Sequence, residues 1–588
     1  MLRRYLILWA ALAVVFPGGM HAHPLDDFFD KFAAEWVRGD PDLATSTQFF
    51  EGDLQDQLDR QLTPISDEYA AERVALAARG LAELDSIDQA GASADTRQAA
   101  RMMRWLLDDI VRAAEFADYE FPINQFTGVQ RNLISFLNST HPIRNLRDGE
   151  NYVARLRGVE TVIRQAIAGM ERREARDMLL PDFIIDATIR QMERFLEPAP
   201  EGNLLVTSLA ERLAKLDDEE TSVRARVVEQ AARIVESSVY PAFEDAVALL
   251  RRQRPHATSD AGIWRFPEGE AAYAHFLRHF TNTDLTAREI HEIGLAQVAR
   301  IETEMDAILR DQGLVEGGVW DRYLELEKRL QPTGSADPRP ELLQRFTDIV
   351  ADSQALAAPL FGLKPEAPVV VRREPAFSEA NSAAHYSLPA PDGSQPGVFW
   401  VPLPGPEFRI IDMRSLSYHE AVPGHHFQLA IQQEMASLPK FISKRIFGFN
   451  SAYGEGWALY AEWLADDAGW YEGDPIGRLG FLKSSLHRAR RLVVDTGIHA
   501  FQWTRQDVID FGLSVAETER YIVWPGQACS YMIGQRQIID WRRQAEATLG
   551  DDFDLKGYHT VILRAAGAPL EVLGDAVESW VEAEAADL

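Results

Sequence analysis

The chain has 588 residues, of which 60 are basic and 90 acidic, so its formal net charge is −30. A chain this acidic repels phosphate backbones and anionic lipids, and the sequence has no basic patch, which excludes nucleic-acid wrapping and broad membrane adsorption. Apolar residues make up 46% of the chain, a value typical of a folded protein. Because Cys529 is the single cysteine, intrachain disulfides and thiolate metal clusters are excluded, and any metal needs His, Asp or Glu ligands.

The N-terminus has the pattern of a cleavable signal peptide over residues 1–22. Arg3 and Arg4 precede the apolar run Tyr5 to Phe16, and small or turn-forming residues follow it. This run is too short to cross a bilayer of about 30 Å. A buried N-terminal helix is the alternative. Since no later stretch reaches 18 consecutive apolar residues, we expect no integral membrane segment after cleavage and a secreted or periplasmic protein.

Most of the remaining sequence has the apolar periodicity of helices. Between Ala225 and Arg254, apolar residues recur at intervals of three and four, and Pro241 is expected to kink or restart that helix. Thr286 and Glu289 form a capping box at the start of another long helix, which Gly313 ends. These patterns predict a mainly α fold.

The length suggests two to four domains, although a single large helical fold is equally possible, and we expect two helical lobes that belong to one unit. The N-terminal lobe is expected over residues 23–265 and the catalytic lobe over residues 266–588. A loop rich in Gly and Pro, residues 331–340, is expected at the surface or at a boundary between lobes.

A small sheet is predicted within the helical protein. Val369–Val371 and Gly397–Val401 are rich in β-branched and aromatic residues. Because Pro396 and Pro402 flank the second strand, we expect it at an edge, where an extended peptide can add by main-chain hydrogen bonds. Phe399 is therefore a candidate substrate-binding residue. The alternative is a hairpin that only covers the core.

The segment Ser417–Gln428 (SYHEAVPGHHFQ) contains three histidines and one glutamate within eight residues. A His-Glu pair followed closely by His is the centre of the zinc peptidase signature, in which two imidazoles bind the metal and the glutamate deprotonates water. We therefore predict His419 as a metal ligand and Glu420 as the general base.

The spacing differs from the standard His-Glu-x-x-His pattern, because Pro423 occupies the position of the second histidine. On a straight helix, His425 would face away from His419, and His426 would lie about 10 Å along the axis. Pro423 and Gly424 can break the helix and return the next imidazole toward His419. His425 is the preferred second ligand, and His426 is the alternative.

Glu455 is the candidate third ligand. It lies 36 residues after His419, at the start of a predicted helix that runs through Glu462. The sequence Glu455-Gly456-Trp457-Ala458 resembles the Glu-x-x-Ala pattern that supplies the third ligand in glutamate-type zinc peptidases. Alternatively, Glu455 only stabilises the N-terminus of this helix.

Four segments together resemble the bacterial DUF885 family, which is grouped with the glutamate-zincin metallopeptidases. They are HEAVPGHHFQ at 419–428, YGEGWALY at 453–460, PGQACSY at 525–531 and YHTVILRAAGAPL at 558–570. The resemblance covers most of the mature chain. It implies a large, two-lobed, helical zinc-peptidase-like fold with a small sheet near the active-site cleft, and short peptides as substrates.

Three further side chains are candidates for contact with substrate. Tyr531 follows a turn and can donate to the oxyanion that develops during peptide hydrolysis. His499 can donate to substrate, and Arg491 can bind a substrate carboxylate. The alternatives are a packed aromatic residue, a core histidine and an arginine that pairs with an acid.

The sequence thus predicts an exported metallopeptidase that uses one zinc ion, although its N and O ligands also fit manganese or cobalt. Two alternatives stay open. A hydrolase of another amide or ester would use the same residues, and the altered spacing is also compatible with an inactive binding protein.

Overall fold

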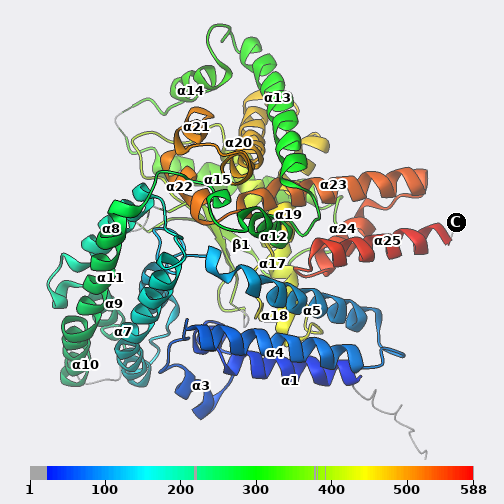
Figure 1. Cartoon of the computed structure of the whole chain (residues 1–588). Helices are drawn as coiled ribbons and strands as arrows, with labels where there is room; N and C mark the ends of the chain where they lie inside the picture. The colour runs from blue at the N-terminus through cyan, green and yellow to red at the C-terminus, as the bar shows by residue number, and fades with distance from the viewer. Residues whose placement is uncertain are drawn as a thin grey trace, which may run out of the picture.

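The structure is a computed structural model that describes residues 23–216, 221–334, 336–375, 379, 382–390 and 393–586. Helices dominate these residues, and a small sheet lies among them (Figure 1). The predicted mainly α fold is confirmed. The predicted signal peptide, residues 1–22, lies outside the described residues. Within the described ranges, no helix has the length and apolar character needed to cross a membrane.

The first five helices share one hydrophobic core with the C-terminal half of the chain. Phe29 contacts Phe441 with ring centroids 5.3 Å apart, and Trp36 contacts Phe447 at 5.1 Å. In Figure 1 these blue helices lie beneath the yellow and red ones. The five helices are α1 (Pro24–Arg38), α2 (Pro41–Thr47), α3 (Gly52–Leu58), α4 (Asp67–Ser86) and α5 (Ala94–Ala113).

The next six helices form a second core. Tyr119 belongs to the first core and Ile123 to the second. The boundary between the two cores therefore lies inside the expected N-terminal lobe. A π-helical turn over residues 235–239 separates α10 from α11 just before Pro241, where a restart was predicted. The helices are α6 (Val129–Ser135), α7 (Leu146–Glu174), α8 (Asp182–Leu196), α9 (Leu204–Leu213), α10 (Thr221–Ile234) and α11 (Tyr240–Gln253).

Four helices follow before the sheet: α12 (Gly269–Thr281), α13 (Ala287–Asp311), α14 (Val319–Arg329) and α15 (Arg339–Ala357). The predicted capping box of α13 is present, because the backbone N–H of Thr286 donates to Glu289 at 2.8 Å and the Thr286 hydroxyl accepts in return. α13 packs along α20 (Pro475–Ala500). A Cβ atom at Gly294 would lie 2.7 Å from Val493, so glycine permits this close approach.

The sheet has the order β1-β3-β2, with β1 (Val369–Arg373), β2 (His385–Ser387) and β3 (Gly397–Val401). β3 pairs parallel with β1 and antiparallel with β2, so the prediction that β3 is an edge strand is wrong. Pro396 and Pro402 lie just outside β3 and therefore remove no hydrogen bond from its ladders. Phe399 is fully buried against Phe346 of α15, so it belongs to the core and not to a substrate site.

The helices that follow the sheet include the two that contain His419 and His425, which are α16 (Met413–Glu420) and α17 (His425–Glu434). The others are α18 (Lys440–Ser443), α19 (Ser451–Asp467), α20, α21 (Arg505–Asp510), α22 (Val515–Val523), α23 (Ser530–Leu549), α24 (Leu555–Arg564) and α25 (Leu570–Ala586). α19 packs against both α16 and α23. The glutamate-containing helix therefore lies between the two segments that supply the other candidate residues.

Candidate metal centre

The helix is interrupted between His419 and His425, as Pro423 and Gly424 predict. α16 ends at Glu420, and α17 begins at His425. A Cβ atom at Gly424 would lie only 1.8 Å from the carbonyl oxygen of His419, so the turn requires glycine there. The indole N–H of Trp457 donates to the carbonyl of Pro423 at 3.0 Å and ties the turn to α19.

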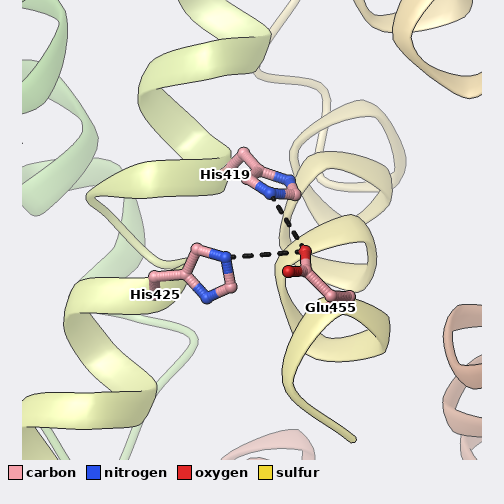
Figure 2. A group of neighbouring side chains, drawn as sticks. All are labelled: His419, His425 and Glu455. Atoms are coloured by element: carbon pink, nitrogen blue, oxygen red, sulfur yellow. Dashed lines mark ion pairs between the residues drawn. The ribbon is translucent and has the colours of Figure 1, made fainter. Parts of the chain in front are cut away.

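This break brings His419, His425 and Glu455 together. Figure 2 shows the two imidazoles from α16 and α17 facing the carboxylate from α19. Oε2 of Glu455 lies 3.6 Å from Nε2 of His419 and 3.7 Å from Nε2 of His425. The two rings are nearly perpendicular, with centroids 4.9 Å apart. One ligand atom from each residue lies within 4.8 Å of the others.

The donor set fits a divalent cation. Two ligand atoms on a tetrahedral zinc ion, each about 2.1 Å from the metal, lie about 3.4 Å apart. The 3.6 and 3.7 Å distances in this cluster differ from that value by only a few tenths of an ångström. The structure thus brings together the three residues that the sequence predicts as ligands, and metal binding itself stays a prediction.

Glu462 and Ser415 orient His419 from behind. Nδ1 of His419 lies 2.8 Å from Oε1 of Glu462, which leaves Nε2 directed at Glu455. The hydroxyl of Ser415 donates to the other carboxylate oxygen of Glu462. Burial lowers the pKa of His419, but the hydrogen bonds to Glu455 and Glu462 outweigh it and raise the pKa to about 10. Positive charge is therefore favoured at this position.

Glycines set the position of Glu455. The Cβ atom of an alanine at Gly456 would lie 2.8 Å from Cα of Gly534 in α23, and one at Gly534 would lie 2.0 Å from the carbonyl oxygen of Ala452. α19 and α23 therefore contact each other backbone to backbone. This contact fixes Glu455, which is one residue from Gly456, relative to α23.

Glu420 lies beside the cluster and has an unusual environment. Its side chain is buried, with 7% exposure, and neither carboxylate oxygen has a hydrogen-bond partner among the described residues. Burial raises the pKa of Glu420, while the imidazoles of His419 and His425 oppose that rise. The Glu420 oxygens are not among the described polar atoms that are fully enclosed without a partner, so they stay accessible to a molecule as small as water.

The comparisons with known proteins give the family of the chain. The family described as "Bacterial protein of unknown function (DUF885)" matches residues 41–577. The chain belongs to the DUF885 family. No curated protein matches it.

Two solved structures share the fold of this DUF885 protein. One is titled as the "putative lipoprotein from Colwellia psychrerythraea", with 30% identity, a TM-score of 0.87, and coverage of 95% of this chain and 99% of that one. The other is a "putative lipoprotein of unknown function" from Shewanella oneidensis, with 18% identity, a TM-score of 0.72, and coverage of 94% and 99%. At 18% identity, the second likeness shows the fold alone.

His426, the alternative second ligand, lies outside the cluster. Its Nδ1 is 2.9 Å from the hydroxyl of Tyr386 in β2, and burial lowers its pKa to about 4. In the DUF885 protein, His425 is therefore the histidine that faces Glu455, while His426 joins α17 to the sheet.

Two predicted substrate contacts are structural. His499 is buried; its Nδ1 accepts from the backbone N–H of Ile263 at 3.2 Å, and its Nε2 lies 3.0 Å from the carbonyl of Tyr521. Arg491 is also buried and donates to Glu517 and to the hydroxyl of Tyr521, both at 2.9 Å. Both side chains thus have partners inside the fold, and the prediction that they bind substrate is not supported.

Tyr531 lies half-buried in the first turn of α23, with its ring 4.5 Å from the guanidinium carbon of Arg491. The neighbouring residue Ser530 contacts Ser451 of α19 through their hydroxyls at 2.6 Å. Ser451 lies one turn before Glu455, so Tyr531 belongs to the element next to the cluster. Its hydroxyl has no hydrogen-bond partner among the described residues.

The sequence reasoning missed Glu462 and His385. Glu462 lies seven residues after Glu455, two turns along one face of α19, and this spacing was a usable signal. His385 of β2 is close enough to Glu420 to lower the pKa of that carboxyl. No spacing rule connects residues 385 and 420, so their proximity needed the fold.

Proposed function

We propose that this DUF885 protein is an exported, zinc-dependent peptidase that hydrolyses short peptides. The observation that carries the proposal is the position of Glu420, a buried carboxylate without a hydrogen-bond partner, directly beside the His419–His425–Glu455 cluster. Metal ligands explain the cluster, and a general base explains Glu420.

His419, His425 and Glu455 would hold the zinc ion, with Glu462 orienting His419. A zinc ion bound there supplies Lewis acidity, which makes water more acidic and a peptide carbonyl more electrophilic. Glu420 takes the proton from the attacking water and later gives it to the leaving amine. The raised pKa of Glu420 suits this role, because a carboxyl that is protonated more easily is a better proton carrier at neutral pH.

Tyr531 is the proposed donor to the oxyanion. Its hydroxyl has no partner within the described fold, and the Ser530–Ser451 contact joins its helix to the helix of Glu455. A neutral phenol can donate to developing negative charge without carrying charge itself. The resemblance to glutamate zincins supports this assignment and a two-lobed, zinc-peptidase-like fold.

Export is supported by two observations. Residues 1–22 have the pattern of a signal peptide, and the solved Colwellia psychrerythraea protein, which is 30% identical, is described as a putative lipoprotein. We therefore expect this protein outside the cytoplasm, where peptides are available as substrates.

The test combines metal analysis with activity. The purified protein is expected to contain one zinc ion and to cleave peptides from a mixed library of peptides, amides and esters. Glu420→Gln should keep the metal but lose about 100-fold to 10,000-fold in kcat. Cleavage of esters alone would indicate a different hydrolase, and absence of stoichiometric metal, or unchanged activity in Glu420→Gln, would contradict the proposal.

A further inference from the structure

A small aromatic cavity lies between α5, α12, α17 and the segment 441–453. Its volume is about 140 Å³, and Phe280, Phe441, Phe447 and Phe449 are among its walls. Pockets for whole small molecules usually measure about 300 to 1,000 Å³. An apolar cavity of about 150 Å³ holds one benzene molecule. The cavity therefore has room for one large apolar side chain.

The cavity adjoins the candidate metal centre. Gln428 lines it and places Oε1 3.5 Å from Nδ1 of His425. Phe449 lines it and has its ring centroid 6.5 Å from that of His425. Ser451, another wall residue, lies one helical turn before Glu455 on the same face of α19. Three wall residues thus lie beside the predicted ligands.

The same cavity contains an arginine without an acidic partner. Arg445 lines the wall, and among the described residues its guanidinium has no hydrogen bond or ion pair. Its backbone is left-handed, with φ of 49°, a conformation that residues other than glycine seldom adopt. In a chain with 90 acidic residues, a half-buried arginine that pairs with none of them favours an anionic ligand.

We propose that this cavity binds the C-terminal residue of a peptide, with a large apolar side chain among the phenylalanines and the terminal carboxylate on Arg445. This inference rests on the proposed peptidase function and names the substrate class. The bond that precedes the bound residue then faces the metal centre, so the enzyme removes aromatic or large aliphatic residues from the C-terminus of short peptides.

Substrate preference tests the inference without any variant. We expect kcat/KM for N-acetyl-Gly-Phe to exceed that for N-acetyl-Gly-Ala by at least about tenfold, because the cavity accepts the ring. It should also exceed that for N-acetyl-Gly-Phe-amide by at least about tenfold, because the amide cannot pair with Arg445. Equal rates for all three peptides would overturn the inference while leaving the peptidase function in place.

Two variants separate the two contacts. Leu106→Trp fills the cavity from α5 and should bring the Phe-to-Ala preference close to one. Arg445→Gln should remove the preference for the free carboxylate over the amide and keep the preference for Phe. The matched controls change exposed side chains and should retain both preferences. They are Leu295→Trp in α13 and Arg233→Gln in α10. A control that loses either preference, or an Arg445→Gln protein that keeps both, contradicts the assignment.

Calorimetry distinguishes failure of the inference from failure of the proposed function. L-Phenylalanine, the product, should bind Glu420→Gln at least about tenfold more tightly than L-alanine or L-phenylalaninamide. If no peptide is cleaved but L-phenylalanine binds and Arg445→Gln weakens that binding, the cavity assignment stands and the peptidase function falls. If L-phenylalanine and L-alanine bind equally, the cavity assignment falls.

Discussion

Glu462 accepts a hydrogen bond of 2.8 Å from Nδ1 of His419 and so determines which ring nitrogen faces Glu455. The carboxylate is itself held by Ser415 and is buried, with 1% exposure. Outer carboxylates of this kind fix the tautomer of a metal-binding histidine and raise its basicity. Glu462 therefore determines how His419 presents Nε2 to a cation.

Glu462→Gln is expected to weaken zinc binding by about 10-fold to 100-fold, because the amide orients His419 less strongly and removes a negative charge. Competition with a chromogenic zinc chelator measures this change. Glu229→Gln, on the exposed side of α10, serves as the control and should bind zinc like the wild type. Equal affinity in Glu462→Gln would show that this carboxylate has only a structural role.

His425 and His426 are expected to respond differently to truncation. His425→Ala removes a predicted ligand, so zinc affinity should fall at least tenfold, by roughly 1.4 kcal/mol or more. His426→Ala removes the contact to Tyr386 and should cost about 2 kcal/mol of folding stability while keeping one zinc per chain. Metal stoichiometry and urea unfolding of both variants measure the two effects. Loss of zinc from His426→Ala alone would reverse the assignment.

Gly424→Ala should disrupt the centre. The added methyl group would lie 1.8 Å from the carbonyl oxygen of His419, so the turn must move, at a cost of about 3 kcal/mol in the free energy of unfolding. Zinc content should fall with it. Gly202→Ala is the matched control, because its nearest neighbour, Pro198, lies 3.7 Å away. If Gly424→Ala unfolds at the same urea concentration as this control, the turn tolerates a side chain and the packing argument fails.

Asp495 makes folding stability depend on pH. Burial raises its pKa from the ordinary 3.8 to about 7, although hydrogen bonds from Tyr273 at 2.6 Å and Gly526 at 3.0 Å oppose the rise. Within the part of the chain that the structure describes, no group donates a hydrogen bond to its Oδ2. Because the folded state holds this proton more tightly than the unfolded state, the contribution is present below pH 4 and is lost as the pH rises toward 7.

The amide of Asp495→Asn does not titrate in this range. The free energy of unfolding of this variant, relative to that of the wild type, should therefore increase between pH 4 and 7. The increase should reach up to about 1.4 kcal/mol for each pH unit. Urea unfolding at pH 5, 6, 7 and 8 measures the difference between the two proteins. Parallel stability curves over this range would mean that Asp495 titrates at its ordinary pKa.

Local sequence patterns predicted local structure well. The capping box of Thr286 and Glu289 appears where expected, and the bend at Pro423 and Gly424 brings His425 to face Glu455. These features depend on neighbouring residues, on steric limits of the backbone and on the chemistry of histidine and glutamate, all of which a sequence displays.

Features that depend on distant partners were not predictable in the same way. Prolines flank edge strands and also lie just outside central strands, so Pro396 and Pro402 do not show which kind of strand contains Phe399. The pairing of β3 with both β1 and β2 shows that the strand is central. The helical pattern around His499 is the same whether its side chain faces a cleft or the core, so the sequence does not distinguish the two. The α1 helix shows an apolar face, but the sequence does not say that Phe441 and Phe447 cover it.

The contact between Gly456 and Gly534 has a consequence for how the protein can vary. One glycine is next to Glu455, and the other is three residues after Tyr531, so the separation of a predicted ligand from a proposed oxyanion donor is set by two residues that have no side chains. A single added carbon at either position would widen the gap between the two helices. Relatives that share the proposed activity should therefore differ at the cavity walls, where specificity can change, while only glycine fits at these two positions.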